Sequence, residues 1–230
     1  MRPGIVAIAA TLTALTASAV TTVVPVSRDT FITEIAGNTT TPHGADNYLY
    51  LVRGGIGVSG YRTFPLLWFD LTSYAGSTVN EASGQLTMTV TGSNVVPTLT
   101  VLVRQSLVSW GESEVTFANL GGTGFNEATQ TGPNLSTTVI TYTAAPQTVS
   151  FAVSSAVIQS WISSPSQNFG LFLSTPATTG SDDKVFSSRE GSFSPTLTFD
   201  ITPVPEPASF LLMISGLAVA GLVRLSKRER

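Results

Sequence analysis

Residues that could carry out catalysis are few and poorly spaced in this sequence. It has one histidine, His43, and no cysteine, which excludes a thiol nucleophile and a histidine-rich zinc site. The carboxylate pairs Glu112/Glu114 and Asp182/Asp183 imitate a glycosidase couple. However, alternate residues of a strand face the same side, and adjacent residues rarely oppose each other across a substrate. We therefore expect a protein that is not an enzyme.

Two short motifs match known chemistry by letters alone. G-x-G-x-x-G occurs at residues 55–60, but it leads into an aromatic strand instead of a helix, so we interpret it as a hairpin loop. S-x-x-K occurs at residues 181–184, in an acidic turn without its companion motifs. Neither motif predicts a nucleotide site or a nucleophile.

The C-terminal end holds the most specific pattern. Glu206 lies between Pro205 and Pro207, and the two prolines exclude regular secondary structure at this point. An uncharged apolar run follows, and it predicts a membrane helix over residues 207–224. At 1.5 Å per residue such a helix is about 27 Å long, just enough to cross a thin bilayer. The basic tail, residues 224–230, would stay in the cytoplasm.

This order of parts resembles the PEP-CTERM sorting signal of Gram-negative bacteria, here residues 204–230. The resemblance implies that an exosortase recognises Pro205, Glu206 and Pro207 and processes the protein during export. These residues would then be a substrate motif, held transiently at the inner membrane before the protein reaches the cell surface or extracellular matrix. A permanent anchor is the alternative, and a buried core helix fits poorly because the segment ends in four cations.

The N-terminal end agrees with export. Arg2 precedes an apolar stretch over residues 5–15, and Ala17-Ser18-Ala19 has the small-x-small pattern of a secretory cleavage site. We predict a signal peptide at residues 1–19. An N-terminal anchor is the alternative, although the apolar stretch is short for a membrane span.

The body between these signals, residues 20–203, has the usual size of one domain. Five of the eleven basic residues and two of the fourteen acidic residues lie outside the body, so its net charge is −6. This charge predicts no nucleic-acid partner. Without cysteine, stability must come from core burial or from a bound ion.

Apolar segments between turn residues predict an all-β fold. Many short strands of this kind indicate an antiparallel sandwich or barrel. One segment, 155–162, has helical spacing and predicts a short helix across an end of the domain, and 123–137 reads as the longest loop. The predicted strands are 48–52, 64–71, 85–90, 99–103, 138–142, 148–153, 170–173, 184–187 and 196–201.

Six motifs in fixed order run through the body. They are R-T-F-P-L-L-W-F-D-L at 62–71, the segment 79–86 from Val79 to Leu86, S-W-G-E-S-E-V-T-F-A-N at 109–119, the segment 150–161, N-F-G-L at 168–171, and F-S-S-R-E with S-P-T-L at 186–197. Together they resemble the DNRLRE domain, also described as carbohydrate-binding module family 96, over residues 27–201. The resemblance implies an antiparallel β-sandwich of jelly-roll type that binds extracellular polysaccharide. The segment 43–48 departs from the family pattern.

The motif residues divide into apolar and polar sets. The apolar set is predicted to be core: Leu67, Phe69, Trp110, Phe117, Phe151, Trp161 and Leu171. The polar set, Asp70, Glu112, Arg189 and Glu190, is predicted to be structural. A charge at a strand end is costly unless it is paired, so we expect Arg189 to bridge Asp70 or Glu112. The alternative is that Arg189 binds sugar, together with Arg62 and Tyr48.

Jelly-roll carbohydrate modules commonly hold calcium near the chain termini, so the resemblance also implies a calcium site. Asp29 and Asp200 lie near opposite ends of the body and could supply its oxygen ligands. Ordinary surface carboxylates are the alternative, and no other cofactor is expected.

Three functions therefore remain open: a polysaccharide-binding surface or matrix protein, a structural matrix protein without sugar affinity, and a glycan-active enzyme. An exposed aromatic platform or a polar cleft would favour the first function over the second. Converging carboxylates in a groove would favour the third. The charge of the body favours a neutral or calcium-bridged polysaccharide over a strong polyanion.

Overall fold

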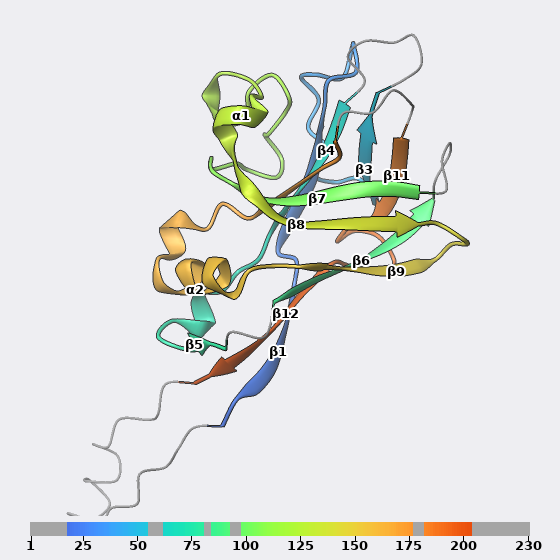
Figure 1. Ribbon diagram of the computed structural model, residues 1–230. Helices are drawn as coiled ribbons and strands as arrows, with labels where there is room; N and C mark the ends of the chain where they lie inside the picture. The colour runs from blue at the N-terminus through green and yellow to red at the C-terminus, as the bar shows by residue number, and fades with distance from the viewer. Residues whose placement is uncertain (1–17, 55–61, 81–83, 93–97, 177–181, 204–230) are drawn as a thin grey trace, which may run out of the picture.

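A computed structural model describes residues 18–54, 62–80, 84–92, 98–176 and 182–203 (Figure 1). Three predicted features lie outside these residues. They are residues 1–17 of the signal peptide, the glycine motif at 55–60, and the sorting segment at 204–230, which contains Pro205, Glu206, Pro207, the membrane helix and the basic tail. Within the described ranges, no helix is long and apolar enough to span a membrane.

The described chain is built mainly of strands, with two short α-helices and three 3-10 turns. The strands are β1 Val20–Pro25, β2 Arg28–Thr33, β3 Tyr48–Arg53, β4 Arg62–Trp68, β5 Thr78–Val79, β6 Gln85–Gly92, β7 Thr98–Ser106, β8 Thr131–Thr141, β9 Gln147–Ala152, β10 Leu171–Ser174, β11 Asp182–Ser187 and β12 Thr196–Thr202. The helices are α1 Glu127–Gln130 and α2 Ser155–Ser163, and the 3-10 turns are η1 Thr72–Tyr74, η2 Leu120–Gly122 and η3 Pro165–Gln167.

The strands form one antiparallel sheet of twelve strands that curls around its own core (Figure 1). The order is β1-β12-β6-β11-β3-β4-β10-β7-β8, with β2 on β4, β5 on β12 and β9 on β6. The prediction of an antiparallel all-β fold is confirmed. The jelly-roll connectivity stays a prediction, because the described strands belong to one continuous hydrogen-bonded sheet.

The two faces of the sheet bury different cores. Adjacent strand residues point to opposite faces, so Leu67 of β4 joins the main core inside the curl while Leu66 joins a second core outside it. The long connection 107–130 covers the second core with Trp110 and Leu120. Of the seven predicted core residues, six are buried, and Phe117 is partly buried against the second core.

The predicted helix at 155–162 is confirmed as α2. Its buried face, Ile158, Trp161 and Ile162, packs into the main core. The Gln159 amide oxygen accepts a hydrogen bond from the backbone N–H of Val79 at 2.7 Å, which fixes α2 against β5.

Three parts of the strand pattern were not predicted, and the shortest is β5 at 78–79. Residues 20–33 form β1, which ends at Pro25, and β2, and Val26 and Ser27 separate the two strands. Residues 131–137, predicted as loop, form the first part of β8. The pairing of this part with β7 shifts register twice. Bulges of this kind tolerate the turn-type residues from which a loop was predicted. Pro133 is accommodated because β8 is the last strand in the order.

The first and last strands lie side by side. β1 pairs antiparallel with β12 from Val20 opposite Ile201 to Pro25 opposite Thr196. The beginning and the end of the described domain therefore leave it at the same place (Figure 1).

Candidate functional site

Four charged residues from three distant segments meet beside the end of β11. Asp29 is in β2, Glu112 is in the connection 107–130, and Arg189 and Glu190 begin the turn after β11. The Arg189 guanidinium donates to Glu112 Oε2 at 3.0 Å and to Glu190 Oε1 at 2.6 and 2.8 Å. Of the two partners predicted for Arg189, the structure therefore places Glu112 beside it. We refer to these four residues as the Arg189 cluster.

The backbone of Arg189 is held as well as its side chain. Its N–H donates to Asp29 Oδ2 at 2.7 Å, and Nη1 donates to the carbonyl oxygen of Ser27 at 2.7 Å. The N–H of Asp29 in turn donates to Glu112 Oε1 at 2.9 Å. The cluster thus joins the start of β2, the connection 107–130 and the turn after β11.

Burial sets the electrostatics of this cluster. Asp29 is only 1% exposed, and this burial raises its pKa to about 7, although the N–H of Arg189 acts in the opposite direction. The hydrogen bond to Glu190 raises the pKa of Arg189. Oxygens of Asp29, Glu112 and Glu190 lie within 4.8 Å of one another and could share a hard cation such as calcium. The Arg189 guanidinium already supplies positive charge to Glu112 and Glu190.

The predicted calcium pair is not brought together. β12 pairs with β1, β5 and β6 but not with β2. Asp200 therefore lies opposite Thr21 and accepts a hydrogen bond from its hydroxyl at 2.7 Å. Asp29 follows eight residues later in β2, which pairs with β4.

Asp70 has a local role apart from Arg189. Its Oδ1 accepts hydrogen bonds from the N–H and the hydroxyl of Thr72, at 3.0 and 2.7 Å. These bonds lower the pKa of Asp70. Asp70 therefore stabilises the turn at η1.

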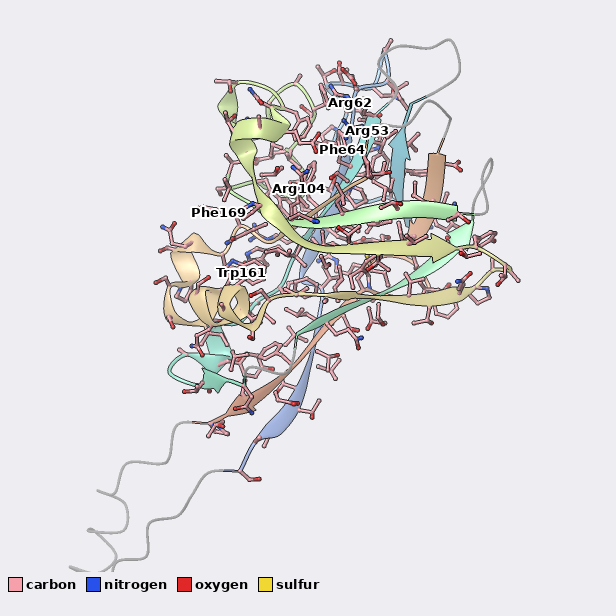
Figure 2. The ribbon with its side chains drawn as sticks, viewed as in Figure 1. Arg53, Arg62, Phe64, Arg104, Trp161 and Phe169 are labelled. Atoms are coloured by element: carbon pink, nitrogen blue, oxygen red, sulfur yellow. The ribbon has the colours of Figure 1, made fainter. Side chains whose placement is uncertain are left out.

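Arg62 is the first residue of β4, at the opposite end of this strand from the Arg189 cluster, and Arg53 and Arg104 lie in the same region (Figure 2). It forms a two-point ion pair with Glu34, which lowers the pKa of Glu34 and raises that of Arg62. Nearby, Arg53 and Arg104 contact the two oxygens of Glu127 at 3.4 and 3.5 Å. We refer to Arg53, Arg104 and Glu127 as the Glu127 cluster.

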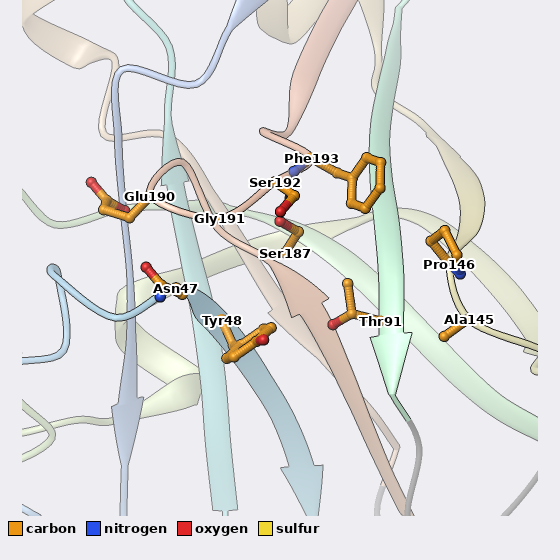
Figure 3. Close-up of a pocket in the computed structure, with 10 residues that line it drawn as sticks. All are labelled: Asn47, Tyr48, Thr91, Ala145, Pro146, Ser187, Glu190, Gly191, Ser192 and Phe193. Carbon is orange, nitrogen blue, oxygen red and sulfur yellow. Dashed lines mark hydrogen bonds between the residues drawn. The ribbon is translucent and has the colours of Figure 1, made fainter.

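Tyr48 lines an open hollow of about 430 Å³ next to the Arg189 cluster (Figure 3). Two aromatic rings are well exposed there, Tyr48 at 46% and Phe193 at 44%. Polar side chains lie between and beside these rings. The lining residues are Asn47, Tyr48, Thr91, Ala145, Pro146, Ser187, Glu190, Gly191, Ser192 and Phe193.

One wall of the hollow is the turn 188–193. The hydroxyl of Ser187 accepts a hydrogen bond from the N–H of Phe193 at 3.0 Å, and the hydroxyl of Ser188 donates to the carbonyl oxygen of Asp46 at 2.6 Å. Gly191 is required because a Cβ there would collide with Ser187 Oγ and would lie 2.6 Å from the carbonyl oxygen of Asn47. The Glu190 carboxylate turns away from the middle of the hollow (Figure 3) and toward Arg189.

Of the three predicted sugar-binding residues, only Tyr48 therefore lines the hollow. Sequence reasoning did not identify Asn47, Ser192 or Phe193. A signal for them exists, because Tyr48 is opposite Ser187 in the β3–β11 pairing. The segments just before β3 and just after β11 must therefore lie together at one edge of the sheet.

Comparison with known proteins identifies the C-terminal segment. The PEP-CTERM protein-sorting motif matches residues 203–228, which contain Pro205, Glu206 and Pro207. No curated protein matches the chain. The chain therefore carries a PEP-CTERM signal, which directs exosortase-dependent sorting of an exported protein to the cell surface or extracellular space.

Proposed function

We propose that the domain of this exported protein is a non-catalytic, DNRLRE-like module that binds exopolysaccharide at the cell surface or in the matrix. The observation that carries the proposal is the hollow with two exposed aromatic rings, Tyr48 and Phe193, among polar side chains. Sugars present apolar C–H faces and hydroxyl groups, and this mixture of rings and hydrogen-bonding groups suits both.

The charged groups near the hollow support binding over catalysis. A glycosidase needs two carboxyl groups facing each other across a substrate. In the Arg189 cluster, Glu112 and Glu190 accept hydrogen bonds from one guanidinium, and Asp29 is buried. Because this guanidinium already supplies positive charge to Glu112 and Glu190, the proposal requires no calcium or other cofactor.

Binding to a panel of cello-, malto- and alginate hexasaccharides tests the proposal. We expect Tyr48→Ala and Phe193→Ala each to weaken binding about tenfold, equivalent to roughly 1.4 kcal/mol. Leu107→Ala is the matched control, because Leu107 is 45% exposed and does not line the hollow. If the wild-type protein binds no glycan, the domain is better described as a structural matrix component without sugar affinity.

The transient membrane stage is a separate part of the proposal. The chain would cross the inner membrane once through residues 207–224 until an exosortase processes it. In a host with the sorting enzyme, Glu206→Ala should leave the fold intact and hold the unprocessed form in the membrane. The control variant Glu114→Ala should be processed like the wild-type protein. Mass and fractionation of each form provide the measurement. Wild-type protein that keeps its basic tail at the cell surface would indicate a permanent anchor instead.

A further inference from the structure

We infer that Arg189 is a positioning residue for the hollow, because it holds the turn 188–193 that forms one wall. In this role it does not contact the sugar itself. The inference rests on the proposed sugar-binding function of the hollow and assigns to Arg189 a part in it.

The contacts of Arg189 support positioning over direct binding. A guanidinium has five N–H donors. Four of its hydrogen bonds go to protein acceptors: two to Glu190, one to Glu112 and one to the carbonyl oxygen of Ser27. Arg189 does not line the hollow, whereas the next four residues, 190–193, all do. The side chain therefore lies behind the wall, and the wall continues directly from it.

The charges explain why this wall needs the guanidinium. Without it, three carboxyl groups with oxygens within 4.8 Å would remain. Asp29 is fixed in β2, and its N–H holds Glu112. Repulsion would therefore act mainly on Glu190, whose side-chain hydrogen bonds within the described part of the chain both come from Arg189. Movement of Glu190 would carry Gly191 and the rest of the wall with it.

Hydrogen–deuterium exchange on the exported protein tests this role without any ligand. We expect Arg189→Met, which keeps the length of the side chain but removes its charge, to speed exchange about tenfold in the peptide covering 188–193. Exchange in α2 should not change. Adding Glu190→Gln to Arg189→Met should restore most of the protection, because it removes the repelling charge. Arg189→Lys should lie between wild type and Arg189→Met, since it keeps the charge but loses the fork of donors.

Binding of the same hexasaccharide panel completes the test. A positioning role predicts that Arg189→Met weakens binding and that the added Glu190→Gln restores it. A direct ligand role predicts lost binding, unchanged exchange at 188–193 and no restoration, and this result would overturn the inference. Unchanged exchange overturns it in any case. If Arg189→Met does not fold, Arg189→Lys with and without Glu190→Gln decides by the same comparison. If wild type binds no hexasaccharide, the proposed function fails, while the exchange data still decide what Arg189 holds.

Discussion

The Arg189 cluster and the Glu127 cluster both hold the connection 107–130 against the sheet through arginine–carboxylate contacts. They differ in the sign of their excess charge. In the first, one guanidinium serves two carboxylates beside a buried third. In the second, one carboxylate serves two guanidinia. Because burial favours the neutral form of a carboxyl group, the Arg189 cluster should respond to pH through Asp29.

The largest expected effect tests this difference through Asp29. Its pKa is raised to about 7, so its contribution to stability is complete below pH 4 and is lost as the pH rises through 7. The amide oxygen in Asp29→Asn can still accept the N–H of Arg189 but never ionises. The variant should therefore gain about 3 kcal/mol relative to wild type between pH 5 and 8.

Urea unfolding of both proteins at each pH measures this difference. The comparison with wild type is necessary because Glu34 and Asp70, whose pKa values are lowered, act in the opposite direction at lower pH. Parallel pH profiles for wild type and Asp29→Asn would show that Asp29 is ionised throughout.

The next effect removes the central residue of the other cluster. Glu127→Ala leaves Arg53 and Arg104 without their shared partner, and each of the three side chains is only 19–25% exposed. We expect a loss of about 2 kcal/mol, less than for a fully buried pair. Urea unfolding of wild type and Glu127→Ala measures this loss. An unchanged free energy of unfolding would show that the Glu127 cluster, unlike the Arg189 cluster, does not stabilise the fold.

The smallest effect concerns Arg62, which the sequence suggested as a sugar ligand. It is partly exposed and pairs with Glu34 on two points, so Arg62→Ala should cost about 1 kcal/mol of stability. Glycan binding should be unchanged, because Arg62 does not line the hollow. A tenfold loss of binding with little change in unfolding would move the sugar site to this end of β4.

The sequence predicts the strands well where the apolar pattern is strong, as in the continuous run of β4 and the alternation of β12. It fails where pairing is irregular, as in the first half of β8. It predicts that Arg189 needs a carboxylate partner, because its charge lies at a strand end. It does not predict the burial of Asp29, since that depends on the packing of segments 83 and 160 residues away. Nor does it predict Phe193, whose exposure depends on the shape of one turn.

The pairing of β1 with β12 also determines how the domain resists a mechanical pull. Tension on the chain beyond Thr202 acts along β12, which is held by β1 on one edge and by β5 and β6 on the other. Its backbone hydrogen bonds are then loaded in shear and share the force. Tension at Val20 acts on β1, which among the described strands pairs only with β12. An attachment through the C-terminal end should therefore withstand more force than one through the N-terminal end.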